Sequence, residues 1–308
     1  MSLRLRGLNL ALRLFAKPRL TRLRALDVVR RDVERVGGGI LRRPPFLCAL
    51  QLDLGAGLAA LSVRAGQVKR PGAVGLYLHG GAYIAGSPRA YLPLLGRLAG
   101  LARVEIVAPD YRLAPEHPFP AALQDAEAAW NALLARGYAP ENIVLIGDSA
   151  GGGLALALLA RLCARATPPA GLVAFSPWTD LTGAGASIWE NRNSDSMLVA
   201  ARLPETAQMY LQGAAADDPG ASPLFARFPD CPPVLIQLSD SEILRDDGLR
   251  MADRLRAFGA RVTVQTWVGA PHVWHMFDGY VPEARAALQD AARAMRAMLR
   301  LSSASGDS

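Results

Sequence analysis

The chain of 308 residues is 51% hydrophobic, which is enough to bury the core of one large α/β domain or of two small ones. It contains no run of the ~18 uninterrupted apolar residues that a membrane-spanning helix needs. A secretory signal is not expected either, because Arg13 interrupts the first apolar stretch and no small-residue cleavage site follows. The three cysteines, Cys48, Cys163 and Cys231, are odd in number and far apart, which argues against a disulfide framework. We therefore expect a cytoplasmic protein.

The net charge of +7 arises from 34 basic and 27 acidic side chains, and much of the excess falls within the first 43 residues. A nucleic-acid-binding protein would combine a basic face with a reader motif; the sequence contains no such motif, so no nucleic-acid partner is expected. We interpret the basic residues as the solvated surface of amphipathic helices, with weak peripheral contact to anionic lipid as the alternative. The arginines concerned are Arg19, Arg22, Arg24, Arg30, Arg31, Arg35, Arg42 and Arg43.

Helical and strand patterns alternate along most of the chain. Residues 1–40 are predicted to form one or two amphipathic helices, interrupted at Pro18 and closed by Gly37, Gly38 and Gly39. Strands are predicted from short β-type runs at Ala59–Val63, Ala73–Leu78, Val104–Ala108, Ile143–Ile146, Gly171–Phe175, Val234–Leu238 and Val262–Thr266. Helices are predicted at Tyr91–Leu101, Pro120–Ala135, Gly152–Arg165, Asp247–Phe258 and Pro282 to about Leu301.

This alternation predicts an α/β fold in a single domain, with a mostly parallel, doubly wound sheet and helices on both faces. Several predicted strands are almost entirely apolar, as expected for strands that are covered on both faces. The functional groups of such a sheet gather at the carboxyl ends of its strands. Asp180–Pro223 breaks the alternation because it carries no strand pattern, and we expect it to lie over the sheet as an insertion.

A sharp turn is predicted between the run Ile143–Ile146 and the helix that follows it. The connecting residues Gly147-Asp148-Ser149-Ala150-Gly151 have the pattern Gly-x-Ser-x-Gly, in which small residues flank a serine on a strained backbone. The alternative is a glycine-rich turn that only packs closely or binds a phosphate, but the predicted strand and helix on either side favour a nucleophile. The spacing also differs from the dinucleotide-binding Gly-x-Gly-x-x-Gly. Ser149 is therefore predicted to be a catalytic nucleophile.

A second glycine-rich segment, His79-Gly80-Gly81-Ala82, directly follows the predicted strand Ala73–Leu78. Nucleophilic attack on an acyl group creates a negative oxygen, and fixed backbone N–H groups stabilise it by ~3 kcal/mol each. We expect these donors, the oxyanion hole, at Gly80, Gly81, Ala82 and the N–H of Ala150. His79 is interpreted as a hydrogen-bonding brace for this loop.

The general base of a serine hydrolase is a histidine that follows the serine and the acid in the chain. His272 and His275 both follow the last predicted strand, whereas His117 lies upstream of Ser149 in a proline-rich turn and is interpreted as structural. His272 is the preferred base, with His275 as a neighbour on the next turn. No carboxylate or cysteine accompanies this pair at ligand spacing, so no metal is expected.

The acid should follow the strand Val234–Leu238, and four carboxylates lie there. Asp246 and Asp247 have the character of a helix start, where acidic residues are common. Asp240 and Glu242 remain, and either carboxylate can hold the imidazole in its working tautomer.

Together these motifs resemble the hormone-sensitive lipase family of α/β-hydrolases, the bacterial family IV esterases. The resemblance covers about residues 70–300 and also includes Asp110–Glu116 (Asp-Tyr-Arg-Leu-Ala-Pro-Glu) and His272-Val273-Trp274. Aligning Leu244-Arg245-Asp246 with the end of the family's acid motif makes Glu242 the acid, although Asp is usual there. The resemblance also implies a helical cap formed by about residues 1–45 and part of 180–223. It further implies short- to medium-chain ester substrates and no required cofactor.

The motifs thus predict that residues 1–308 form a single α/β-hydrolase domain. We expect this domain to be a serine carboxylesterase that hydrolyses a small-molecule ester through an acyl-enzyme intermediate. An amidase or a lactone hydrolase would use the same residues, and only substrate assays separate them. Plant relatives of this family that serve as hormone receptors have lost the catalytic histidine, whereas His272 is present here. The sequence identifies neither the physiological substrate nor the oligomeric state. A homodimer is one of the oligomeric states that it allows.

Overall fold

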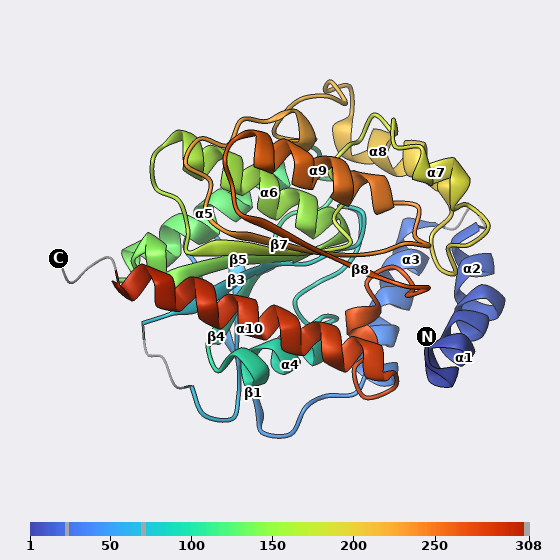
Figure 1. The fold of residues 1–308 in the computed structure, drawn as a ribbon, viewed down its shortest axis with the longest axis horizontal. Helices are drawn as coiled ribbons and strands as arrows, with labels where there is room; N and C mark the ends of the chain where they lie inside the picture. The colour runs from blue at the N-terminus through green and yellow to red at the C-terminus, as the bar shows by residue number, and fades with distance from the viewer. Residues whose placement is uncertain (22–24, 69–71, 305–308) are drawn as a thin grey trace.

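The computed structural model describes residues 1–21, 25–68 and 72–304, and an eight-stranded sheet forms its centre (Figure 1). β1 and β2 pair antiparallel, β2 pairs antiparallel with β4, and all remaining neighbours pair parallel. The mostly parallel sheet is therefore confirmed. In spatial order the strands are β1 (Leu47–Asp53), β2 (Ala59–Ala65), β4 (Glu105–Pro109), β3 (Val74–Leu78), β5 (Ile143–Asp148), β6 (Gly171–Phe175), β7 (Val234–Ser239) and β8 (Val262–Trp267).

Helices cover both faces of the sheet, as predicted (Figure 1). One face carries α4 (Leu92–Ala102) and α10 (Pro282–Ala304). The other face carries α5 (Ala121–Ala135), α6 (Ser149–Ala164) and α9 (Arg245–Ala257). Every residue of β3, β4, β5, β6 and β7 is buried between these layers, which explains their continuous apolar runs.

Two elements near the start of the sheet and at the serine turn differ from the sequence-based prediction. β1 was not expected, because as an edge strand it is mostly exposed and paired only to β2, so it lacks the apolar pattern of a buried strand. The helix expected from Gly152 begins at Ser149 instead. Glycine is a poor helix former, but here Gly151, Gly152 and Gly153 are buried against other backbone segments, so packing outweighs the intrinsic propensity.

The N-terminal region is helical for longer than expected. α1 (Leu3–Ala11), a π-helical turn (Leu12–Ala16) and α2 (Lys17–Thr21) follow one another without a break, so the interruption expected at Pro18 is wrong. The wider π-helical turn, in which the Lys17 N–H bonds to the Leu12 carbonyl, precedes the proline that lacks an N–H group. The predicted basic residues Arg22 and Arg24 lie outside the described residues.

α3 (Leu26–Arg35) continues into a second π-helical turn (Val36–Ile40), so the three glycines lie inside the helical segment, which ends at Ile40. Asp180–Pro223 contains α7 (Ser187–Glu190) and α8 (Leu203–Leu211) and no strand, as predicted. In Figure 1, α1, α2, α3, α7 and α8 gather beyond one end of the sheet. Short 3-10 turns lie at Pro140–Asn142, Ala200–Arg202, Pro223–Phe225 and Trp274–Phe277.

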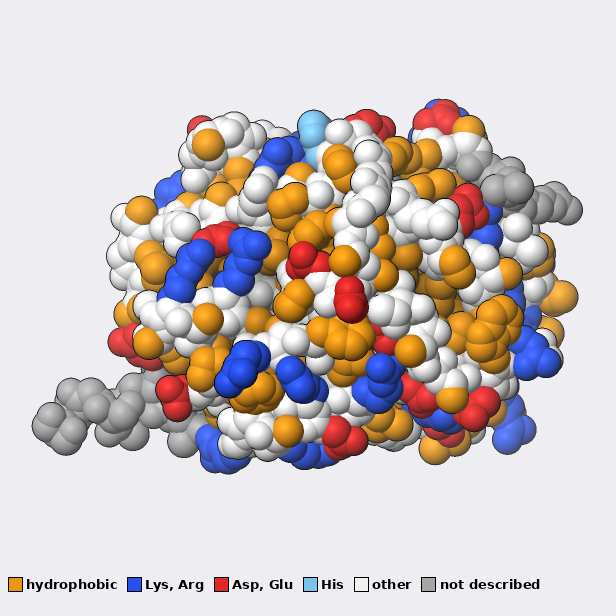
Figure 2. Space-filling view, turned by 90° about the horizontal axis from the view of Figure 1, so that it is seen from above, with side chains coloured by type: hydrophobic (Ala, Val, Ile, Leu, Met, Phe, Trp, Pro, Cys, Tyr) orange, Lys and Arg blue, Asp and Glu red, His pale blue; other side chains and the backbone are white. Residues whose placement is uncertain are grey.

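The face above α6 and α9 carries basic and acidic side chains interspersed among hydrophobic ones (Figure 2). Among the described residues, no helix combines the length and the hydrophobicity needed to cross a bilayer. Cys48, Cys163 and Cys231 are free thiols in this structure.

Replacing Leu145 by Ala should lower the free energy of unfolding by about 2–5 kcal/mol, because this fully buried residue of β5 would leave a cavity. Leu50→Ala on the exposed edge strand is the matched control and should change it by about 0.5 kcal/mol or less. Urea unfolding measures both values. Equal losses for the two variants would contradict the burial pattern described here.

Candidate active site

Ser149 lies at a sharp turn between β5 and α6. Its φ angle is +52°, a left-handed conformation that is strained for serine and typical of a nucleophile elbow. The turn is possible only because its neighbours lack side chains. A Cβ atom on Gly147 would clash with the Gly151 carbonyl, and one on Gly151 would clash with the carbonyls of Leu78 and His79. The predicted strand, turn and helix are thus all present, and Ser149 begins the helix.

The loop after β3 lies directly against this turn. Ala82 and Tyr83 have positive φ angles of 56° and 64°, and Gly81 has a φ of 118°. The expectation for Gly80 is corrected, because its N–H donates a hydrogen bond of 2.9 Å to Asp148 Oδ1. This donor is therefore engaged within the protein, and the N–H groups of Gly81, Ala82 and Ala150 remain as candidates for binding an oxyanion.

Asp148, the residue before Ser149, is fully buried and was not singled out from the sequence. Besides Gly80, it accepts hydrogen bonds from the hydroxyls of Tyr77 (2.7 Å) and Tyr91 (3.0 Å). Burial raises the pKa of Asp148 to about 6, although these three donors oppose the rise. The carboxyl group thus ties β5, β3, the glycine loop and the start of α4 together beneath Ser149.

His79 braces the same loop, as predicted. Its Nδ1 lies 2.7 Å from the Gly80 carbonyl, its ring stacks on Tyr111 at 4.3 Å, and the Tyr111 hydroxyl donates to the His79 carbonyl at 2.6 Å. Burial lowers the pKa of His79 to about 4, so the ring is neutral near pH 7. Since Tyr111 belongs to the segment Asp110–Glu116, this contact explains why that segment accompanies the glycine loop.

His272 and Glu242 form a buried pair at the carboxyl ends of β8 and β7. His272 Nδ1 lies 2.7 Å from Glu242 Oε2, while Glu242 Oε1 accepts a hydrogen bond of 2.8 Å from the Ser239 N–H. Burial disfavours a charged imidazole, but the hydrogen bond and the charge of Glu242 outweigh it and raise the pKa of His272. The other ring nitrogen, Nε2, is buried and has no hydrogen-bond partner among the described residues.

Two backbone contacts bring the histidine loop toward Ser149. The Trp178 N–H donates to the Ser149 carbonyl at 2.9 Å, and the Val273 N–H donates to Ser176 Oγ at 3.3 Å. The loop after β6 thus connects the serine turn to the loop that carries His272.

The remaining candidates have other partners. Asp240 Oδ1 accepts a hydrogen bond of 2.8 Å from the Gly269 N–H, so it supports the backbone of the histidine loop. His275 Nε2 lies 2.8 Å from Gln237 Oε1, and burial holds the pKa of His275 well below its usual value. His117 is exposed on the proline-rich turn.

The insertion also contributes residues that the sequence did not identify. Asn191 Nδ2 donates to the carbonyls of Asp240 and Glu242, both at 2.9 Å, and Asp195 Oδ2 accepts from the Ile243 N–H at 2.9 Å. Asp195 Oδ1 in turn accepts from Met197 and from the next residue, both at 2.8 Å. The turn that carries Glu242 is therefore held from above by residues 191–195.

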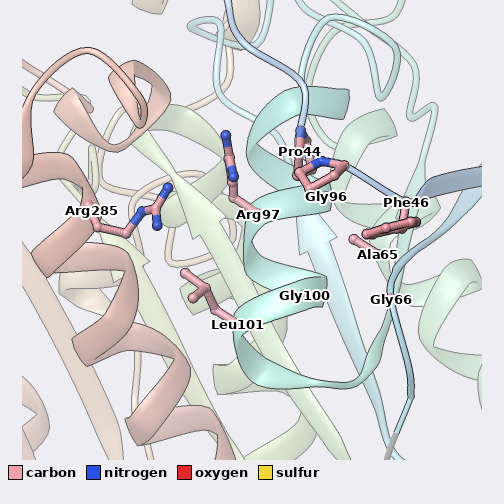
Figure 3. Close-up of a pocket in the computed structure, with 10 residues that line it drawn as sticks. Pro44, Phe46, Ala65, Gly66, Gly96, Arg97, Gly100, Leu101 and Arg285 are labelled. Carbon is pink, nitrogen blue, oxygen red and sulfur yellow. The ribbon is translucent and has the colours of Figure 1, made fainter.

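A pocket of about 220 Å³ lies elsewhere, between α4, the start of β1 and α10 (Figure 3). The side chains of Arg97 and Arg285 line it, and both pair with the buried Asp278 at 2.7 Å. It shares no lining residue with the serine turn or with the Glu242–His272 pair.

Comparison with known proteins agrees with this geometry. A family described as having the alpha/beta hydrolase fold matches residues 75–276. An acetyl-hydrolase of Streptomyces hygroscopicus is 40% identical over 222 residues, which are 72% of this chain and 74% of the relative. An esterase of Acinetobacter venetianus is 36% identical over 220 residues, which are 70% of this chain and 72% of the relative.

Solved structures extend the likeness over almost the whole chain. The esterase EstE5 superimposes with a TM-score of 0.93 at 35% identity, covering 97% of this chain and all of its own. An esterase from the bacterial hormone-sensitive lipase family superimposes with a TM-score of 0.91 at 35% identity, covering 97% and 99% of the two chains. The chain belongs to the α/β-hydrolase fold family and is a carboxylic-ester hydrolase. Within that fold it is a member of the hormone-sensitive lipase family of bacterial esterases, as the sequence motifs indicated.

The network at Asp148 predicts a defined pH dependence of stability. Its native pKa of about 6 lies above the usual value near 4, so the native state binds this proton more tightly than the unfolded state. Stability from this proton is present at low pH and is lost as the pH rises through 6. Between about pH 4 and pH 7, the unfolding free energy of the wild type minus that of Asp148→Asn should fall by about 2 kcal/mol. Parallel urea titrations measure it; a difference independent of pH would contradict the assignment.

Proposed function

We propose that this ester hydrolase is a serine carboxylesterase for short- to medium-chain esters, with Ser149 as nucleophile, His272 as base and Glu242 as acid. The observation that carries the proposal is the buried pair of Glu242 and His272 with an unpartnered Nε2, on the loop connected to the serine turn. Such a pair fixes the imidazole with its free nitrogen directed to a reacting hydroxyl.

Acylation begins when Ser149 Oγ attacks the acyl carbon of the ester and its proton passes to His272 Nε2. The carbonyl oxygen becomes an oxyanion, which the N–H groups of Gly81, Ala82 and Ala150 bind. The bond to the alcohol oxygen then breaks, and His272 returns the proton to the leaving alcohol. The product is an ester between the acyl group and Ser149.

Deacylation repeats these steps with water. His272 takes a proton from the water as its oxygen attacks the acyl carbon, and the bond to Ser149 Oγ breaks. The proton then returns to Ser149, which releases the carboxylic acid. Glu242 stays ionised throughout and stabilises the imidazolium that forms twice in each cycle.

We further propose that residues 1–45 and part of 180–223 form a cap that limits the acyl chain. Support comes from α3, whose Arg30 Nε donates to the Ile84 carbonyl at 2.8 Å, just beyond the glycine loop. Leu26, Val29 and Val33 of the same helix pack against the hydrophobic core cluster that also contacts Ala82.

The homodimer considered from the sequence is a separate prediction. Sedimentation velocity of the purified protein would test it.

Glu242→Gln should lower kcat for p-nitrophenyl butyrate about a thousandfold or more, because the imidazole loses its charged partner. Asp240→Asn is the matched control, since it weakens one backbone hydrogen bond and should cost roughly tenfold or less. The acidic limb of the kcat/KM profile should also move to lower pH in Glu242→Gln, because the carboxylate no longer raises the pKa of His272.

Ser149→Ala sets the background rate of this assay. Hydrolysis by the wild type no faster than by Ser149→Ala would contradict the proposal, and so would greater damage from Asp240→Asn than from Glu242→Gln. Acyl esters, anilides and lactones tested side by side separate the esterase from an amidase or lactone hydrolase. Among the esters, butyrate should be hydrolysed faster than laurate.

A further inference from the structure

We propose that the outer face of residues 3–20 docks this enzyme onto an anionic lipid membrane. This inference goes beyond the proposed function, and it concerns binding rather than chemistry. It rests on the division of the N-terminal helical segment into an anchored inner face and an outer face that combines exposed apolar and basic side chains.

The inner face is attached to the rest of the protein. Leu5 is fully buried in a cluster with Ala270 and Trp274 of the histidine loop. Asn9 Nδ2 donates to the Gly269 carbonyl at 2.7 Å, and Lys17 Nζ donates to the Asp195 carbonyl at 2.6 Å. These contacts fix the rotation of the helical segment, so the side chains of its outer face point away from the protein.

The outer face carries large apolar side chains in contact with water. Leu3 is 82% exposed and Phe15 is 63% exposed. The full set, defined here as the apolar outer residues, is Leu3, Leu10, Leu14, Phe15 and Leu20. Apolar side chains presented in this way are typical of helices that lie in the interfacial region of a bilayer.

Basic residues alternate with these apolar side chains, and no acidic residue precedes Asp27 in the chain. Among the described residues, Arg4, Arg6 and Arg19 form no ion pair, and Arg13 donates to the Ser194 carbonyl at 2.8 Å. By contrast, the face above α6 and α9 mixes both signs of charge (Figure 2). The charge of the outer face complements an anionic lipid surface, where each arginine strengthens binding about fivefold.

The same charge argues against a second copy as the occupant. A two-fold interface would place this face against itself, and the arginines of both copies would then repel one another across it. An anionic bilayer instead accepts both the arginines and the apolar side chains. Because Leu5 rests on Ala270 and Trp274, docking would hold the loop of His272 close to the lipid surface.

Cosedimentation of the full-length protein with vesicles tests the proposal without any turnover. Vesicles of phosphatidylcholine and phosphatidylglycerol should bind the protein at least tenfold more strongly than phosphatidylcholine alone, and high salt should abolish the difference. The double variants Arg4→Gln/Arg6→Gln and Leu14→Ser/Phe15→Ser should each weaken binding about tenfold or more. Both should keep the wild-type circular dichroism spectrum and urea unfolding midpoint, which shows that they fold.

Two matched controls complete the design. Arg256→Gln/Arg293→Gln removes two exposed charges from α9 and α10, and Leu50→Ser removes an exposed apolar side chain from β1; neither should change vesicle binding. Equal binding to neutral and anionic vesicles, or equal loss in the controls, would overturn the proposal. It would also be overturned if vesicles bound nothing while Leu14→Ser/Phe15→Ser converted a dimer to a monomer in sedimentation velocity.

Discussion

At the end of β5 the chain must turn from a buried strand directly into a buried helix, and the side chain at the turn must face outward. Only a left-handed residue at position 149 satisfies both conditions, and the strain is accepted because the surrounding packing leaves no alternative. Gly147 and Gly151 allow the backbone segments to touch, and the His79 carbonyl lies where a side chain on Gly151 would be. The glycine loop and the serine turn are therefore held in contact, and the conformation of each depends on the position of the other.

Two buried carboxylates support this arrangement in opposite ways. Asp148 has no cationic partner at hydrogen-bond distance among the described residues and receives three neutral donors, so burial dominates and its pKa rises. Glu242 has an imidazole at 2.7 Å and raises the pKa of that imidazole instead. One carboxyl group thus organises the backbone beneath Ser149, while the other raises the pKa of His272. The two carboxylates differ in their roles because Asp148 contacts neutral donors, whereas Glu242 contacts the imidazole of His272.

Much of the fold and most of the site could be predicted from the sequence. The central parallel strands are apolar because helices cover both faces, so their pattern is strong. Ser149 directly follows the buried strand β5 and Glu242 lies just after the buried strand β7, whereas His272 follows the partly exposed strand β8. β1 could not be predicted, because exposure on the sheet edge removes the apolar signal. The continuity of the helix through Pro18 depended on a π-helical turn that no residue pattern announces.

Contacts between distant segments were also beyond the sequence. A motif indicates that Gly80 lies near an oxyanion, but only the fold shows that its N–H is already bonded to Asp148. Likewise, the support of the Glu242 turn by Asn191 and Asp195 joins residues that are 51 and 48 positions apart, and no local spacing predicts it.

The central claim is that Ser149 forms a covalent acyl intermediate, and trapping that serine tests it most directly. Diethyl p-nitrophenyl phosphate transfers a diethylphosphoryl group to an activated serine and releases p-nitrophenol. Peptide mapping by mass spectrometry should find one diethylphosphoryl group per chain, on the peptide that contains Ser149, and none in Ser149→Ala. Modification of another residue with Ser149 unlabelled, or inhibition without any adduct, would contradict the mechanism.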